Sequence, residues 1–134
     1  MSIASSIAAS GMNVAALRLQ VSASNVANVM SNGPLPGSND SKSYPGAYVP
    51  SRVDQTATVG GGTSATVSPI SPSAVPVFDP TAPYANQEGM VASPNVDLAS
   101  EMIQQVIASY TFAANAKVMQ IDGQMTAALL NIIA

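Results

Sequence analysis

The chain has 134 residues, which suffices for one ordinary domain. Only 8% of them are charged, and four basic residues against seven acidic ones give a net charge of −3, so no basic patch for nucleic-acid binding exists. The absence of cysteine and histidine excludes disulfides, thiolate or histidine-assisted catalysis and the usual zinc ligand sets.

Residues 2–30 have the apolar pattern of an amphipathic helix. Small side chains at helical spacing, among them Gly11, let a second helix approach closely, although Gly11 also fits as a tolerated flaw costing about 1 kcal/mol against alanine. We expect the helix to end at Asn32-Gly33-Pro34, because glycine can adopt the left-handed cap and proline cannot continue a helix. The larger apolar residues of this segment recur three, four or seven positions apart and are Ile3, Ile7, Val14, Leu17 and Val21.

The first residues do not indicate a secretory signal or a membrane span. Residues 2–17 carry no charge, but serine, asparagine and glycine dilute their apolar character, and no basic segment precedes a leucine-rich core. The stretch also falls short of the roughly 20 mostly apolar residues that cross a bilayer. We therefore expect no membrane insertion.

The middle of the chain, residues 33–94, contains all ten prolines. Residues 48–56 and 64–68 flank Gly60-Gly61-Gly62 and predict a small β-hairpin, with Pro50 favouring an edge strand. The tract 69–83 has the composition of an extended, polyproline-like chain. A disordered linker is the alternative interpretation of this region.

The last third of the chain predicts one long helix. No proline follows Pro94, and either Asn95 or Asp97 can cap the start, with Glu101 near the first turn, where a carboxylate complements the helix dipole. About 35 residues would form a rod of roughly 50 Å. Its apolar stripe comprises Ile103, Ile107, Tyr110, Ala114, Val118, Ile121, Met125, Ala128 and Ile132.

These elements predict a mainly α fold in a single assembly domain. The N-terminal helix (1–32) and the C-terminal helix (95–134) would pair as a coiled-coil-like hairpin, with the Pro/Gly-rich region (33–94) between them containing the small β-hairpin and extended chain. Both helices carry too few charges for solvated helices, and isolated helices are marginal in water, so we expect copies of the hairpin to pack together.

No residue pattern points to catalysis or to a cofactor. Asp97 and Glu101, four residues apart, could share a metal ion or a proton, but with no histidine nearby helix-start electrostatics is the favoured interpretation. Gly60-Gly61-Gly62 lacks the GK[ST] sequence of a phosphate-binding loop and is interpreted as a turn. We predict no enzyme and no catalytic, cofactor-binding or metal-binding residue.

Several strings match known sequence signatures. Ser22-Ala23-Ser24-Asn25-Val26-Ala27-Asn28 resembles the S-x-N-[LI]-A-N signature of bacterial flagellar rod and hook proteins. The order of the later strings is similar to the rod protein C family of proximal-rod subunits, from which the chain departs at Asn86, Met90 and Tyr110. Those strings are Ala85-Asn86-Gln87-Glu88-Gly89-Met90-Val91, Pro94-Asn95-Val96-Asp97, Glu101-Met102-Ile103, and then Ala108, Phe112, Ala114, Asn115 and Val118.

The resemblance implies a structural subunit of the proximal rod of the flagellar basal body, which crosses the periplasm. Such subunits polymerise by helix packing into a hollow drive shaft that transmits motor torque. The implied partners are copies of the chain, other flagellar rod proteins and the flagellar type III export apparatus, with no cofactor, nucleic acid or small-molecule substrate. A membrane-active helical hairpin is the alternative, but basic flanks and an uninterrupted apolar stretch are both missing.

The predicted assembly residues combine the apolar stripes with three asparagines. Asn25 and Asn28 are expected to form backbone or cross-subunit hydrogen bonds near the helix end. Asn115 is interpreted as a buried polar residue that sets helix register, with ordinary exposure as the alternative. The full set is Ile3, Ile7, Val14, Leu17, Val21, Asn25, Asn28, Ile107, Asn115, Val118, Ile121 and Met125.

Overall fold

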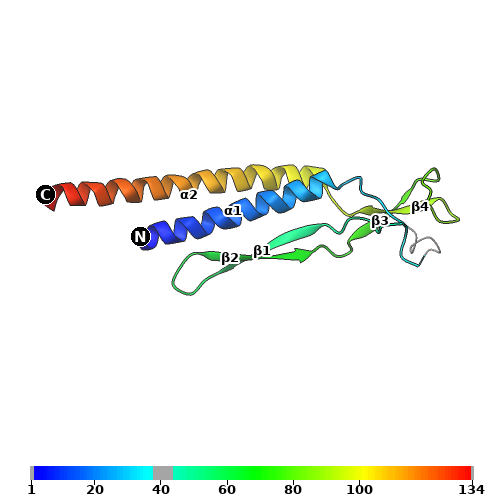
Figure 1. Ribbon diagram of the computed structural model, residues 1–134, viewed down its shortest axis with the longest axis horizontal. Coiled ribbons are helices and arrows are strands. Elements are labelled where there is room, and N and C mark those ends of the chain that lie inside the picture. The colour runs from blue at the N-terminus through cyan, green and yellow to red at the C-terminus, as the bar shows by residue number, and fades with distance from the viewer. Residues whose placement is uncertain (1, 38–43, 134) are drawn as a thin grey trace.

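The computed structural model describes residues 2–37 and 44–133, so residues 38–43 of the predicted middle region and the outermost residues of both predicted helices lie outside it. Figure 1 shows an elongated molecule in which two helices run side by side and a β-hairpin lies along them. A second small sheet lies at the end of the molecule away from both termini. The elements are α1 (Ile3–Ala27), β1 (Ser51–Ala57), β2 (Thr63–Pro69), β3 (Ala74–Phe78), β4 (Met90–Pro94) and α2 (Leu98–Ile133).

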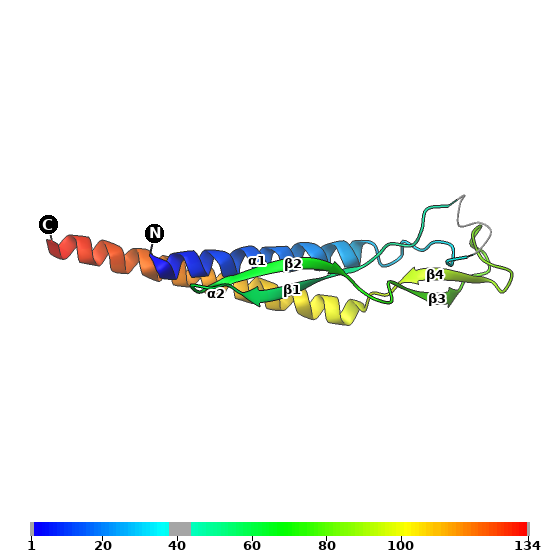
Figure 2. The same cartoon turned by 90° about the horizontal axis from the view of Figure 1, so that it is seen from below.

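The prediction of a mainly α fold is wrong, because the chain is an α+β protein with two antiparallel two-stranded sheets. β1 pairs with β2 in the register Val53↔Val67, and β3 pairs with β4 in the register Val77↔Val91. The second sheet includes residues of the tract 69–83, which the sequence indicated to be polyproline-like chain. Both sheets are visible in Figure 2, one beside the helices and one beyond them.

The local geometry explains why prolines do not prevent the second sheet. Pro76 lies opposite Ala92 in the register. Ala92 directs both its N–H and its C=O to Gly33 on its other side, at 2.9 Å each. The missing N–H of Pro76 therefore costs no hydrogen bond between β3 and β4, and β-branched neighbours such as Val77 and Val91 favour the extended conformation.

Helix α1 begins after Ser2, whose hydroxyl accepts a hydrogen bond from the Ser5 N–H at 3.1 Å. It ends at Ala27, several residues before the expected Asn32-Gly33-Pro34. Asn28 caps this end, donating its backbone N–H to the Ser24 carbonyl at 3.1 Å. The chain is then free to bring Gly33 to β4, so this glycine serves the sheet and not the helix cap.

Helix α2 starts with Asp97 as its cap, which decides between the two candidates. The Asp97 carboxylate accepts hydrogen bonds from the Ala99 N–H at 3.0 Å and from the Ser100 hydroxyl at 2.7 Å. These hydrogen bonds hold the pKa of Asp97 below its ordinary value, and the one from the Ser100 hydroxyl has the largest effect. Asn95 instead donates its side-chain amide to the Pro72 carbonyl at 2.9 Å and so ties the helix start to the chain before β3.

The buried apolar residues are small and few. They lie along the contact between the helices and in β4, where Val91 is fully buried. Most large apolar side chains of the described residues are exposed instead, and α2 contributes many of them. The buried apolar residues are Ala8, Val14, Ala15, Val91, Ala92 and Ala108.

Candidate functional site

The two helices pack antiparallel along a seam of small residues (Figure 1). Ala8, Ala15 and Ala108 expose 1%, 2% and 2% of their surface. A Cβ atom added to Gly11 would lie 2.8 Å from the side-chain amide of Asn115, so the helix backbones are in close approach there. The seam therefore depends on short side chains and not on large apolar ones.

Polar contacts hold both ends of this seam. Near the start of α1, the Asp122 carboxylate accepts hydrogen bonds from Ser2 Oγ at 2.5 Å and from Ser5 Oγ. These hydrogen bonds lower the pKa of Asp122, and the one from Ser2 has the largest effect. At the other end, Ser22 Oγ donates to the Glu101 carbonyl at 3.0 Å. Because both pairs must form together, they fix the register of α1 against α2.

Asn25 connects the helix pair to the β1–β2 hairpin. Its side chain is 1% exposed and donates to the Glu101 carboxylate at 2.6 Å and to the Ser51 carbonyl at 2.8 Å. Its Oδ1 accepts from the Ser51 N–H and from the Tyr48 hydroxyl, each at 3.1 Å. All hydrogen-bonding capacity of this buried amide is used, and it joins α1, α2 and β1 at one point.

The tip of the hairpin is attached separately. The Thr63 N–H donates to Ser10 Oγ at 3.1 Å. Gly62 has a φ of +90°, and a Cβ added there would meet Ser10 Oγ at 2.7 Å, so glycine is needed both for the turn and for the approach to α1. The β1–β2 hairpin is thus attached to α1 at both of its ends, at Asn25 and at Ser10.

The structure separates the predicted assembly residues into two groups. Val14 and Asn25 are buried, and Leu17, Val21, Asn28 and Asn115 are half-buried. Asn115 faces Gly11 in the seam. The remaining predicted residues have 39% to 74% of their surface exposed; Ile7 lies beside Gly61 of the hairpin turn and Ile107 lines the groove next to the hairpin, and the others lie outside the seam. These remaining residues are Ile3, Ile7, Ile107, Val118, Ile121 and Met125.

Sequence reasoning identified only part of the seam, namely the small side chains around Gly11 and Asn115, and missed Ala108 and the polar contacts of Ser22, Glu101 and Asp122. Glu101, Ala108, Asn115 and Asp122 are each seven positions apart, and so are Ala8, Ala15 and Ser22. A seven-residue spacing of small and polar residues is the signal that could have found them. The search for large apolar residues instead selected the outward-facing stripe.

Helix α2 extends beyond the start of α1, and this extension has no cover within the described chain (Figures 1 and 2). Every residue described from Gly123 to Ile132 is exposed. Together with the outer stripe of α2, this makes a long continuous apolar surface. Large exposed apolar patches on a protein mark sites of interaction.

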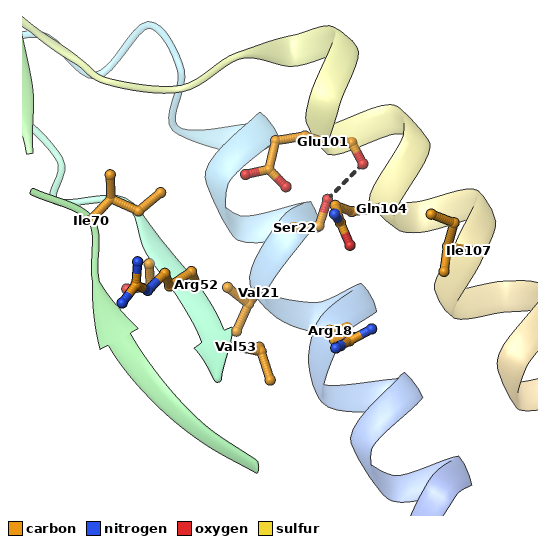
Figure 3. A pocket seen from close by; sticks show the side chains of 10 residues that line it. Arg18, Val21, Ser22, Arg52, Val53, Ile70, Glu101, Gln104 and Ile107 are labelled. Atoms are coloured by element: carbon orange, nitrogen blue, oxygen red, sulfur yellow. Dashed lines mark hydrogen bonds between the residues drawn. The ribbon is translucent and has the colours of Figure 1, made fainter. Parts of the chain in front are cut away.

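A groove runs between the hairpin and α2, with α1 as its floor (Figure 3). Its volume is about 340 Å³. Arg52 at its wall is paired with Asp54 at 3.2 Å, and the Glu101 carboxylate is bound by Asn25. Among residues 2–37 and 44–133, no three acidic side chains gather where they could hold a metal ion, and neither helix has a segment long and apolar enough to span a membrane.

Known proteins resemble this chain over most of its length. Residues 87–132 match the family described as flagellar basal body rod FlgEFG protein C-terminal. The flagellar basal-body rod protein FlgC of Salmonella typhimurium is 34% identical over 117 residues, which cover 84% of this chain and 83% of the relative. FlgC of Agrobacterium fabrum is 29% identical over 133 residues, covering 99% of this chain and 95% of the relative.

Proposed function

Since the chain belongs to the flagellar basal-body rod protein FlgC family, we propose that it builds the proximal part of the rod by packing its helix pair against neighbouring subunits. The chain is a structural subunit of the flagellar basal-body rod. Two surfaces make these contacts with neighbouring subunits: the outer apolar stripe of α2 and the exposed apolar residues of α1.

The proposal is supported by a difference in residue type between the two faces of the helices. Small and polar residues already satisfy the intramolecular seam, so the large apolar residues remain free for partners. Ile107, Val118 and Ile121 still expose 44% to 45% of their surface, so burying the rest of each side chain contributes roughly 1 kcal/mol, a little under half of the value for full burial. A few such residues per subunit are enough to drive association.

The same geometry suits a polymer. An elongated subunit whose contact surfaces differ from each other makes head-to-tail contacts, and these generate open helical assemblies when the rotation does not close. Many parallel helix contacts would make a stiff shaft that can transmit torque across the periplasm. The partners on this proposal are copies of the chain and other rod proteins, and the flagellar type III export apparatus delivers the chain to the growing rod.

Isolation of hook–basal bodies tests the proposal. Particles from flagellated cells are washed at high salt and alkaline pH, and the chain is sought by mass spectrometry. We expect it to remain with the particles, as tightly as other axial proteins do, while a peripheral membrane protein is removed. Recovery of the chain only in the wash or in the soluble fraction would overturn the proposal.

A further inference from the structure

Backbone hydrogen bonds fix which residues of the β1–β2 hairpin turn their peptide groups outward. The Ile70 N–H donates to the Pro50 carbonyl at 2.8 Å at one end of the hairpin, and the Thr58 N–H donates to the Gly62 carbonyl at 3.2 Å at the other. Bonded and non-bonded pairs alternate along an antiparallel ladder, so every second residue directs its N–H and C=O away from the partner strand. The outward residues are Ser51, Val53, Gln55 and Ala57 in β1, and Thr63, Ala65, Val67 and Pro69 in β2.

Some of these outward groups already have partners, and others do not. Ser51 exchanges hydrogen bonds with the Asn25 side chain, and the Thr63 N–H donates to Ser10. Pro69 has no N–H to donate. The remaining outward N–H and C=O groups bind no other segment of the described chain, and they belong to Val53, Gln55 and Ala57 in β1 and to Ala65 and Val67 in β2.

Among the described strands, those of the second sheet have no comparable edge. On the outer side of β4, Ala92 is bonded to Gly33 at 2.9 Å, and the Met90 N–H donates to the Asn86 side chain at 2.8 Å. On β3, Pro76 lies at the centre of the outer edge, and its missing N–H breaks the row of donors. Proline at this place is a common means of preventing an edge strand from pairing with another chain. The β1–β2 hairpin therefore holds the edges that are open to a further strand.

We propose that the outer edge of β1 in one copy of the chain pairs with the outer edge of β2 in a second copy, so that hairpins of neighbouring subunits form a continuous sheet. This inference rests on the proposed rod function. Subunits of a polar rod point in one direction, and β1 and β2 run in opposite directions, so the two edges meet antiparallel. The strands lie side by side across the long axis, with their outer edges on opposite sides (Figure 2). Such a head-to-tail contact repeats from subunit to subunit.

Side-chain type selects the register of this pairing. With Val53 opposite Val67 of the next copy and Gln55 opposite Ala65, each pair exchanges both of its backbone hydrogen bonds. Val67 is 49% exposed in the single chain and gains a β-branched neighbour across the new strand pair. A shift by two residues would instead set the polar Gln55 against Val67. The valine register is therefore favoured.

The blocked and charged positions agree with the same register. Ser51, whose peptide groups are held by Asn25, lies opposite Pro69, which lacks an N–H, so neither loses a bond. Arg52 and Asp54 each lie beside a serine or threonine of β2 and meet no like charge. Pairing of two β1 edges would require copies that point in opposite directions, which a polar rod does not provide.

Disulfide cross-linking tests this pairing, because the chain contains no cysteine. Thr56 of β1 and Ser64 of β2 are exposed, and the register places them opposite each other in neighbouring copies at a non-hydrogen-bonded position. Cα atoms lie about 4.5 Å apart at such a position, which suits a disulfide. Cells express two tagged variants, one with Thr56→Cys and one with Ser64→Cys, and isolated basal bodies are oxidised and separated without reductant. Each chain carries one cysteine, so a bond joins two copies, and we expect the heterodimer to be the main product.

Additional variants test the register and the backbone contact. Thr66→Cys in place of Ser64→Cys should give about fivefold less heterodimer with Thr56→Cys, because diagonal neighbours lie about 7–8 Å apart. In the chain that carries Ser64→Cys, Val67→Pro removes one outward N–H without breaking a β1–β2 bond, so it should lower the yield severalfold more than Val67→Ala does. Asp54→Cys with Thr66→Cys is a second pair in the same register, for use if Thr56→Cys or Ser64→Cys blocks assembly.

The outcomes separate the pairing from the rod function. Basal bodies that contain both variants but show no heterodimer for either pair would overturn the pairing and leave the rod function standing. Equal yields from Ser64→Cys and Thr66→Cys with Thr56→Cys, or from Val67→Pro and Val67→Ala, would overturn the pairing as well. Absence of the unsubstituted chain from basal bodies would overturn the rod function itself.

Discussion

Replacing Asn25 by alanine should weaken the fold more than any other single polar substitution in α1. The side chain makes four hydrogen bonds to three residues, namely Tyr48, Ser51 and Glu101. The substitution removes them together and leaves a space that alanine does not fill. It also leaves the backbone N–H and C=O of Ser51 without their partners at a place where the amide was 1% exposed.

The size of the effect follows from these contacts. Three of the bonds are between neutral groups, each contributing about 1 kcal/mol, and the bond to the Glu101 carboxylate contributes about 2 kcal/mol. Tyr48, Ser51 and Glu101 are half-buried, so water regains part of this loss. We expect Asn25→Ala to reduce the free energy of unfolding by about 3 kcal/mol.

Urea unfolding of the dilute chain, followed by circular dichroism at the helix band, measures this change. The matched control is Asn28→Ala, which removes an amide whose bonds to Ser24 and Ser31 lie at the surface and which should cost less than about 1 kcal/mol. If the two variants unfold at the same urea concentration, Asn25 does not join the hairpin to the helices, and the reasoning is refuted.

Three further substitutions test other parts of the helix pair. Hydrogen bonds keep the pKa of Asp122 below its ordinary value of 3.8, so its contribution to stability is complete only above about pH 5 and is lost as the pH falls through the lowered pKa. Asp122→Asn should therefore flatten the loss of thermal stability between pH 4 and pH 2, and an unchanged slope would contradict this. Gly11→Leu should destabilise the dilute chain by about 1–3 kcal/mol in urea, because its side chain enters the space of Asn115. Gly123→Ala should stabilise it by up to about 1 kcal/mol, since a Cβ there meets no other atom; a loss of stability would show that residues 123–132 are in contact with the rest of the chain.

Sequence periodicity predicted a helix at each end of the chain and a hairpin near Gly60-Gly61-Gly62, and the structure has α1, α2 and the β1–β2 hairpin there. These elements depend on local signals: apolar spacing for the helices, and three glycines with positive φ for the turn. The end of α1 was harder to place, because the Asn28 cap competes with the stronger local signal at Gly33.

The second sheet could not be predicted from the tract 69–83 alone. Prolines such as Pro72 and Pro76 favour extended chain in isolation. What allows the sheet is the bridge between Gly33 and Ala92, a contact between residues far apart in sequence that moves the hydrogen bonds of β4 away from Pro76. A fold class derived from local pattern was bound to omit this sheet.

The face of the helices that is left exposed for partners could be predicted only in part from the sequence, for a related reason. Hydrophobic periodicity identifies which residues share a helix face but not which face meets the partner helix of the same chain. Here the short side chains of Ala8, Ala15 and Ala108 allow the closest approach, so the face with large residues such as Ile121 is left outside. The partners of Asn25 likewise come from two segments far from it in sequence, residues 48–51 and the start of α2, and carry no local signature.

On the proposed function, this outer apolar face makes the subunit contacts of the rod. Ile121→Asp places a charge in it, whereas Gln120→Asp, which can still accept a hydrogen bond from Lys117, places the same charge on a neighbouring polar position. Both variants should unfold at the same urea concentration as the unsubstituted chain, because neither residue lies in the seam. Measurement of each variant in isolated hook–basal bodies, together with swimming motility, then decides. We expect Ile121→Asp to be absent from the particles and the cells not to swim, while Gln120→Asp is retained. Normal incorporation and motility with Ile121→Asp would contradict it.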